Sequence, residues 1–269
     1  ACRRVPRRVT LSYKAVEEPL IYPPPERAWL DVSVSALRHN ASEMQRRMGL
    51  PLIPMVKANA YGVGAAGVVR ALESLDPMAY GVATIAEGEA LRELGIVRPL
   101  IVFTPVLAAE HARARTAGLT LALGDSESIR SWGLSGGQYH LAIDTGMSRA
   151  GVDWRDVASV RDAVRACPPQ GAFTHFHSAE SDDGSARAQV ERFFAALAEI
   201  GTPIAILHGD NSAAAALAVE ASGRWSAIRP GVFLYGVGRE LGINPQPVVS
   251  LRARVVDLRW IEPGYSVSY

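Results

Sequence analysis

The hydrophobic residues of the chain fall into short runs separated by longer amphipathic stretches. The runs are apolar and β-branched at nearly every position, which is typical of strands buried on both faces of a parallel sheet. From residue 28 onward, eight such runs occupy residues 52–58, 79–85, 99–104, 119–125, 139–146, 171–178, 203–210 and 225–231.

The stretches between the runs have the spacing and composition of helices. Examples are AEGEALRELG at 86–95, ARAQVERFFAALAEIG at 186–201 and NSAAAALAVEASG at 211–223. An alternation of strands and helices predicts a parallel sheet covered by helices. Eight strand–helix units favour an α/β fold of the (β/α)8 TIM-barrel type, although periodicity alone does not exclude a doubly wound open sheet.

The two ends of the chain differ from this pattern. Residues 1–26 are basic and Pro-rich and lack the apolar core of a secretory signal, so we expect a loosely ordered N-terminal extension. Residues 27–240 would form the barrel. Residues 241–269 alternate polar with β-branched residues, which predicts the opening strands of a C-terminal β domain that is incomplete at residue 269.

Composition narrows the class of protein. The chain has 269 residues, 48% of them apolar and 20% charged, as expected of a globular protein. A net charge of +1 gives no sign of nucleic-acid binding, and no apolar run approaches the roughly 18 to 20 residues of a membrane span. Two cysteines, Cys2 and Cys167, predict neither a disulfide framework nor a metal site. We therefore expect a cytoplasmic protein without a metal.

Polar residues recur where the apolar runs end. Taken singly, each is most simply a helix cap, an ordinary core or surface histidine, or a solvated arginine. A barrel, however, brings the carboxyl ends of all its strands to one rim, where active sites are built. The set therefore predicts an active site formed by Lys57, Asp144, His175, His208 and Arg229.

Lys57 has a specific chemical use at such a rim. A partly desolvated lysine favours the neutral amine, which can form a Schiff base with the aldehyde of pyridoxal phosphate. Asn211 and Ser212 at a helix start, and Gly231 with no side chain, could anchor the phosphate. Each of these anchors is a weak signal alone, because Asn-Ser is also an ordinary cap and Pro-Gly an ordinary turn.

Five motifs then show a resemblance to a known family. They are VKANAYGVG, AIDTGMSRAGV, FTHFHSAESD, HGDNSAAA and IRPGVFLYGVG, and their order and spacing resemble those of alanine racemase over about residues 27–269. The resemblance implies a pyridoxal-phosphate enzyme that joins an N-terminal barrel to a C-terminal β domain. It further implies a homodimer that interconverts L- and D-alanine for bacterial cell-wall precursors.

The resemblance also implies roles for individual residues. Lys57 would hold the cofactor and move the α-proton on one face of the substrate. Arg149 would contact the phenolic oxygen of the cofactor and the carboxylate of the substrate. His175 would pack against the cofactor ring and be linked to a second base.

The remaining cofactor contacts follow from the same motifs. Tyr61, Ser212 and the backbone at Gly231 and Val232 would surround the phosphate, next to Asn211. Arg229 would face the pyridine nitrogen, supported by His208. A guanidinium has only donors, so it would keep that nitrogen unprotonated and the ring a weaker electron sink, which suits racemisation.

Three departures from the family accompany these matches. The second base of the family is a Tyr in the C-terminal domain of the partner subunit, and neither Tyr265 nor Tyr269 matches its motif. Ala142 stands where many relatives have a carbamylated lysine that orients the arginine, so this support for Arg149 is absent here. Val63 replaces a histidine, which we consider a minor change.

Three other readings compete with alanine racemisation. One is a barrel-only protein that binds pyridoxal phosphate in cofactor homeostasis, and a second is an inactive truncated racemase with exposed strand edges. A third is a racemase acting on a broader set of amino acids, which would share these motifs.

Overall fold

A computed structural model describes residues 26–181, 183–217, 223–238 and 243–268. Its main sheet has the strand order β2-β3-β4-β5-β7-β8, and every neighbouring pair is parallel. A short strand, β6 (Val152–Asp153), also pairs with β5. The strands of the main sheet are β2 (Tyr80–Val82), β3 (Leu100–Val102), β4 (Thr120–Leu123), β5 (Tyr139–Asp144), β7 (Gly171–Phe173) and β8 (Ile206–His208).

Two further segments close this sheet into a ring. The Ile53 N–H donates to the carbonyl of Ile228 at 2.8 Å, the Val56 N–H to Gly81 in β2, and the Ser226 N–H to Leu207 in β8. Six strands and these two segments make eight positions, which confirms the predicted barrel and excludes the open sheet. The closing segments form only isolated bridges. They contain Pro51, Pro54 and Pro230, and proline cannot donate to a ladder.

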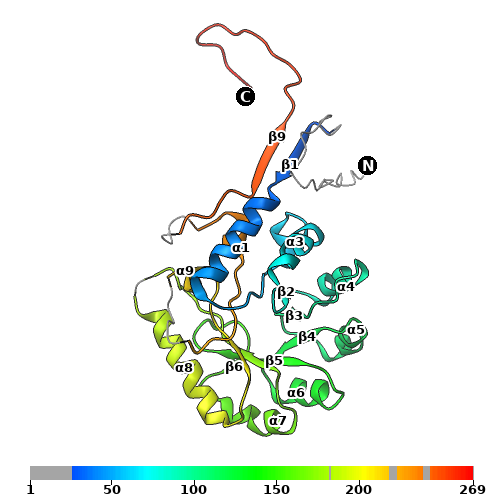
Figure 1. Cartoon of the computed structure of the whole chain (residues 1–269), viewed down its shortest axis with the longest axis vertical. Helices are drawn as coiled ribbons and strands as arrows, with labels where there is room; N and C mark the ends of the chain where they lie inside the picture. The colour runs from blue at the N-terminus through cyan, green and yellow to red at the C-terminus, as the bar shows by residue number, and fades with distance from the viewer. Residues whose placement is uncertain (1–25, 182, 218–222, 239–242, 269) are drawn as a thin grey trace.

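Helices surround the barrel (Figure 1). The expected helices at 86–95, 186–201 and 211–223 are confirmed as α4, α8 and α9, although residues 218–222 lie outside the described part. The α-helices are α1 (Val34–Met48), α2 (Lys57–Tyr61), α3 (Ala65–Leu72), α4 (Ile85–Glu93), α5 (His111–Thr116), α6 (Ser126–Gly133), α7 (Arg161–Ala166), α8 (Ser185–Ile200) and α9 (Ser212–Leu217). Short 3-10 turns are η1 (Glu73–Leu75), η2 (Ala108–Glu110), η3 (Val157–Val160) and η4 (Val232–Tyr235).

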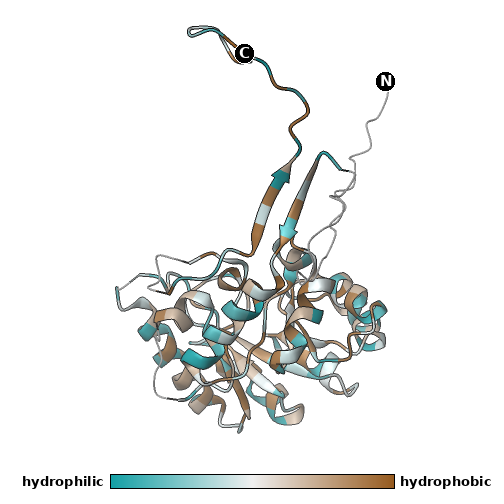
Figure 2. Ribbon diagram, turned by 45° about the horizontal axis from the view of Figure 1, so that its top comes forward, coloured by the Kyte–Doolittle hydropathy of each residue, from teal (hydrophilic) through white to brown (hydrophobic). Residues whose placement is uncertain are grey.

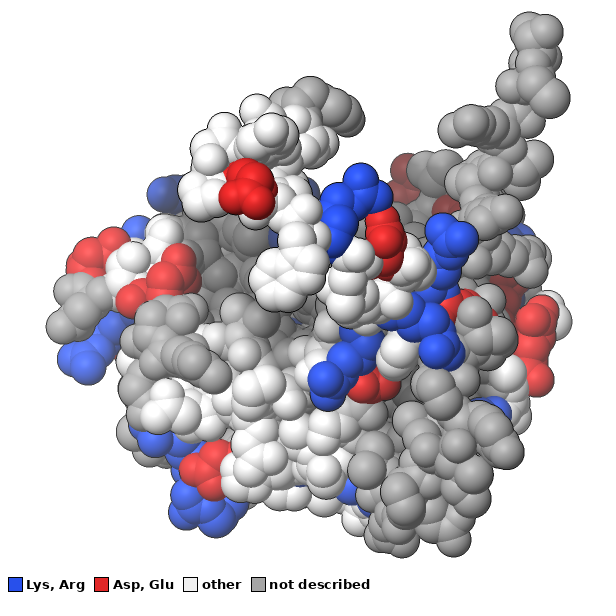
Figure 3. Space-filling model, turned by 90° about the horizontal axis from the view of Figure 1, so that it is seen from above, with Lys and Arg blue, Asp and Glu red and all other residues white. Residues whose placement is uncertain are grey.

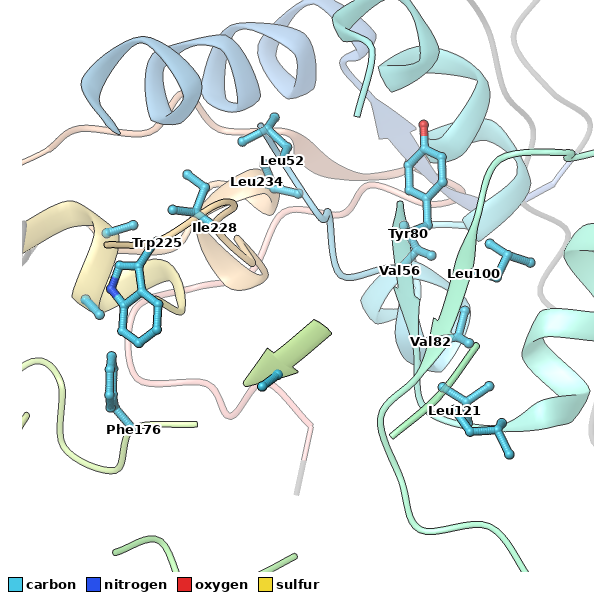
Figure 4. Packing of buried hydrophobic residues seen from close by; sticks show 14 of the residues in the cluster. Leu52, Val56, Tyr80, Val82, Leu100, Leu121, Phe176, Trp225, Ile228 and Leu234 are labelled. Carbon is cyan, nitrogen blue, oxygen red and sulfur yellow. The ribbon is translucent and has the colours of Figure 1, made fainter. Parts of the chain in front are cut away.

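Alternate residues of the strands fill two separate regions. Those facing the helices form one large apolar cluster, of which Figure 4 shows a part that includes Leu52, Tyr80 and Leu100. Their chain neighbours Ile53, Ala79 and Ile101 belong to a second, smaller cluster, as the two-residue period of a strand requires. The second cluster therefore lies inside the barrel, beneath the rim.

An antiparallel pair projects from the barrel (Figures 1 and 2). Strand β1 (Ala28–Val32) pairs with β9 (Val249–Ala253), with Leu30 opposite Leu251. Strand β9 confirms the expected start of a β-type region, whereas the pattern did not predict its partner β1. Residues 254–268 continue from β9 without further helix or strand. On the face viewed from above, acidic and basic side chains lie interspersed (Figure 3).

The predicted domain limits at 26/27 and 240/241 stay predictions. Residues 1–25 and 239–242, on which both limits depend, lie outside the described residues. Over the residues that the structure describes, no helix is long and apolar enough to cross a membrane.

Candidate active site

A pocket of about 790 Å³ opens at the carboxyl ends of the barrel strands. The position is the one at which barrels build active sites. Of the five strand-end residues predicted from the sequence, only His208 does not line the pocket, because it is fully buried beneath Arg229. Predicted site residues that line it are Lys57, Tyr61, Arg149, His175, Asn211, Ser212, Arg229, Gly231 and Val232.

Lys57 begins a turn of opposite hand to an ordinary helix. The four residues Ala58 to Tyr61 all have φ between 51° and 55°, in the left-handed region. Such a conformation costs L-residues about 1–2 kcal/mol each. Gly62 ends the turn at φ 87°, and the Asn59 side chain accepts a hydrogen bond from Ala65 at 2.9 Å. The turn places the side chains of both Lys57 and Tyr61 at the pocket.

A carboxylate ties this turn to the next barrel unit. Glu87 accepts hydrogen bonds from the backbone N–H groups of Ala58 and Ala83, both at 2.7 Å. The same residue completes a capping box with Thr84 at the start of α4. Glu87 therefore fixes the backbone next to Lys57 and places a negative charge close to it.

The Lys57 amine lies in surroundings that favour its neutral form. Burial, and then the positive charge of Arg149, lower the pKa of Lys57, while the charge of Glu87 opposes the shift. A neutral amine is the nucleophilic form. The Lys57 Nζ also lies 5.8 Å from the centre of the Tyr61 ring.

Tyr61, Ser212 and Gly231 meet at one end of the pocket. The Ser212 hydroxyl accepts hydrogen bonds from the N–H groups of Gly231 at 2.8 Å and Phe233 at 3.4 Å. A Cβ atom on Gly231 would lie 2.6 Å from the Tyr61 hydroxyl oxygen, so only glycine lets these residues approach so closely. Asn211 caps α9 by accepting from Ala213 and Ala214.

Asp144 organises the loop that carries Arg149. Its carboxylate accepts hydrogen bonds from the N–H groups of Gly146, Ser148 and Arg149 at 2.9–3.2 Å. Asp144 thus acts on the backbone of the loop. The guanidinium of Arg149 is exposed at the pocket and makes no hydrogen bond or ion pair with the described residues.

Arg229 is held from below by a dense set of acceptors. Its Nη1 donates to Nδ1 of His208 at 2.7 Å and to the His208 carbonyl at 2.6 Å. Its Nη2 donates to the carbonyls of Thr174 at 2.6 Å and Gly209 at 2.9 Å, and lies 3.5 Å from Nδ1 of His175. The guanidinium is therefore fixed and almost completely buried at the pocket floor.

Burial sets the protonation of this floor. It lowers the pKa of Arg229 to about 10, partly offset by the charge of Asp210, so Arg229 stays protonated at neutral pH. Burial, followed by the charges of Arg229, Arg149 and Lys57, lowers the pKa of His175 to about 3. The histidines of the site are consequently neutral.

Two residues of the site were missed by sequence reasoning. Glu87 had a signal, since Thr84 and Glu87 have the spacing of a capping box, but the pattern gave no hint of its contact with Ala58. His140 lies inside β5, and its Nδ1 is 2.7 Å from Nε2 of His208. A histidine within an apolar run was the available signal.

Comparisons with known proteins show which proteins this chain resembles. The profile described as "Alanine racemase, N-terminal domain" matches residues 32–239. An alanine racemase from Geobacter sp. (strain M21) is 34% identical over 264 residues, covering 89% of this chain and 69% of that protein. Among solved structures, alanine racemase from Clostridium difficile 630 has a TM-score of 0.81 at 25% identity, covering 91% of this chain and 69% of that one.

A histidine racemase from Leuconostoc mesenteroides subsp. sake shares the fold, with a TM-score of 0.82 at 23% identity over 92% of this chain and 71% of that one. The barrel, the lysine at its rim and the relatives named above together define a pyridoxal-phosphate-dependent amino-acid racemase. The chain belongs to the alanine racemase family.

Proposed function

We propose that Lys57 binds pyridoxal phosphate and that the bound cofactor serves the racemisation of alanine. The observation that carries the proposal is a lysine of lowered pKa facing a pocket that also contains Arg149 and the Tyr61–Ser212–Gly231 cluster. These residues fit the cofactor: an amine for the aldehyde, hydroxyl groups for the phosphate, and a donor-only guanidinium at Arg229 for the ring nitrogen.

The cofactor, when bound, supplies a conjugated ring that acidifies the Cα proton of an attached amino acid. Lys57, which would hold the cofactor through its Nζ, would also remove or return that proton on its own face of the substrate. The guanidinium of Arg149, which makes no hydrogen bond or ion pair with the described residues, would hold the substrate carboxylate. Arg229 would donate a hydrogen bond to the ring nitrogen and, because it gives up no proton, leave that nitrogen unprotonated.

One base acts on one face of the substrate. Lys57 alone could therefore exchange the Cα proton with solvent but could not invert the centre. Inversion needs a second acid/base on the opposite face, and we assign that role to no residue of this chain.

Alanine as substrate is supported by the names of the relatives. We extend the proposal to a homodimer in the cytoplasm whose D-alanine is used for cell-wall precursors. A broader racemase is the second candidate, because a histidine racemase shares the fold.

The cofactor proposal is tested by reductive labelling. The chain has two lysines, Lys14 and Lys57, so incubation with pyridoxal phosphate, reduction with borohydride and peptide mass mapping give a clear answer. We expect one phosphopyridoxyl group, on Lys57, and none in Lys57→Arg. Equal labelling of both lysines, or of Lys14 alone, would overturn the proposal.

The substrate proposal is tested by hydrogen exchange. Each enantiomer of alanine and of histidine is incubated with the loaded protein in D₂O, and deuterium at Cα is measured. We expect exchange with alanine that is lost in Lys57→Arg. Exchange with histidine at an equal or higher rate would favour the broader racemase.

A further inference from the structure

Beneath Arg229, the barrel interior holds two histidines joined by a hydrogen bond. His208 Nε2 and His140 Nδ1 are 2.7 Å apart, and both side chains are buried. His208 also stacks on Phe173, with ring centres 5.3 Å apart and planes inclined by 3°. His140 does not line the pocket, so whatever it does for the reaction must act through His208.

The chemistry of arginine fixes the direction of the two hydrogen bonds that link Arg229 to His208 and His208 to His140. A guanidinium can only donate, so Nδ1 of His208 must accept from Arg229. The proton of a neutral His208 is then on Nε2, and this N–H donates to Nδ1 of His140. His140 in turn carries its own proton on Nε2.

Protonation of either ring would disrupt this series of hydrogen bonds, because the Nδ1 of the protonated ring would become a donor. Burial and the charge of Arg229 lower the pKa of His140 to about 4, with a side-chain interaction from Gln170 opposing the shift. Burial, and then the charges of Arg229 and His140, hold the pKa of His208 well below its ordinary value. Both rings therefore stay neutral at neutral pH.

Stacking on Phe173 does not by itself select the orientation of His208. A half-turn of the imidazole about its bond to Cβ preserves the stack but exchanges nitrogens with carbons. Only the orientation seen here satisfies Arg229 at Nδ1 and His140 at Nε2 together. A buried N–H without an acceptor is costly, so the acceptor on His140 holds the ring in this state.

We infer that His140 is a positioning residue for the reaction: by accepting from His208 it fixes the tautomer and orientation with which His208 holds Arg229 at the pocket floor. The inference rests on the proposed function, since Arg229 matters because it faces the cofactor.

The first test needs no cofactor. In protein labelled with ¹⁵N-histidine, NMR of the imidazole nitrogens should show His208 and His140 both protonated on Nε2, with each Nδ1 unprotonated. Signals are assigned by single substitution of the six histidines. A proton on Nδ1 of either ring would overturn the inference, whatever the labelling of Lys57 shows.

The second test uses a matched pair of variants. In His140→Asn the amide oxygen stands near the position of Nδ1 and can still accept, whereas His140→Leu has nearly the same shape and cannot. We expect His140→Leu to lose the hydrogen-bonded Nε2 proton signal of His208, and His140→Asn to keep it.

The same pair separates positioning from packing in the loaded protein. Exchange of the alanine Cα proton should fall at least about tenfold in His140→Leu, the effect of a buried donor left unpaired, and return to within about threefold of wild type in His140→Asn. Equal losses in both variants would reduce His140 to a packing residue. If His140→Leu does not fold, the wild-type NMR result still decides. Labelling of Lys57 tests the cofactor proposal separately.

Discussion

Burial is the main cause that lowers the pKa of Lys57, and two neighbours of opposite charge modify this shift. Arg149 approaches from the loop after β5 and lowers the pKa of the amine, whereas Glu87 approaches from α4 and raises it. The two side chains come from barrel units far apart in sequence. The pKa of Lys57 therefore depends on whether these two distant barrel units have come together at the rim.

Substituting these two neighbours should move the Lys57 pKa in opposite directions. Arg149→Gln removes a positive charge and is expected to raise the pKa, whereas Glu87→Gln removes a negative charge and is expected to lower it. Competitive acetylation over a range of pH, followed by mass mapping of the Lys57 peptide, measures both. Shifts of the same sign in the two variants would contradict the electrostatic account.

Among the elements, the turn after Lys57 has the least ordinary backbone. Its sequence, KANAY, contains no glycine, yet four successive residues adopt positive φ. Backbone contacts hold it: Glu87 accepts from Ala58, and the Gly62 N–H donates to the Ala58 carbonyl at 2.9 Å. Strain of this kind persists where the surroundings over-determine it, and it is concentrated at functional sites.

Substitution by glycine should therefore affect the stability of the protein differently at two exposed alanines. Ala58→Gly relieves a left-handed conformation and is expected to leave stability unchanged or raise it by about 1 kcal/mol, after the entropic cost of glycine. Ala195→Gly, in the middle of the right-handed helix α8, should lower stability by about 1 kcal/mol. Urea unfolding of both variants measures the difference, and equal losses would show that the turn carries no strain.

The sequence predicted the fold, and the meeting of the candidate residues at one rim, more fully than the local geometry of these residues. Eight apolar runs were enough to predict the barrel, and motifs were enough to bring Lys57 and Arg229 to one rim. The hand of the turn after Lys57 was not predictable, because alanine and asparagine give no sign of positive φ without their contacts. The pattern likewise could not show that the Gly231 N–H already donates to Ser212.

Over the whole molecule, the interior keeps several histidines neutral. Burial is the main cause that lowers the pKa of four of them: His111, His140, His175 and His208. In the unfolded chain these rings bind protons near pH 6.5. Between about pH 6.5 and pH 4 the unfolded state therefore binds more protons than the folded state, and the free energy of unfolding falls as the pH is lowered.

Removing one buried imidazole should make the free energy of unfolding depend less steeply on pH. We expect the slope of the unfolding free energy against pH to be smaller in His140→Asn by up to about 1.4 kcal/mol per pH unit between pH 6 and 4.5. His39→Asn, on an exposed position of α1, controls for the loss of an imidazole. Denaturant titrations at several pH values provide the measurement, and an unchanged slope in His140→Asn would show that His140 is not held neutral by the fold.

The closure of the barrel has a consequence for the order of folding. The seam is formed when residues 51–55 pair with residues 228–230, so it cannot form until nearly the whole barrel has been synthesised. Contacts between such distant segments form slowly. Lys57 and Tyr61 follow one side of the seam, and Arg229 and Gly231 belong to the other. A ligand that contacts residues on both sides of the seam binds only the closed barrel. Its binding would therefore stabilise the closed barrel relative to forms in which the seam is open.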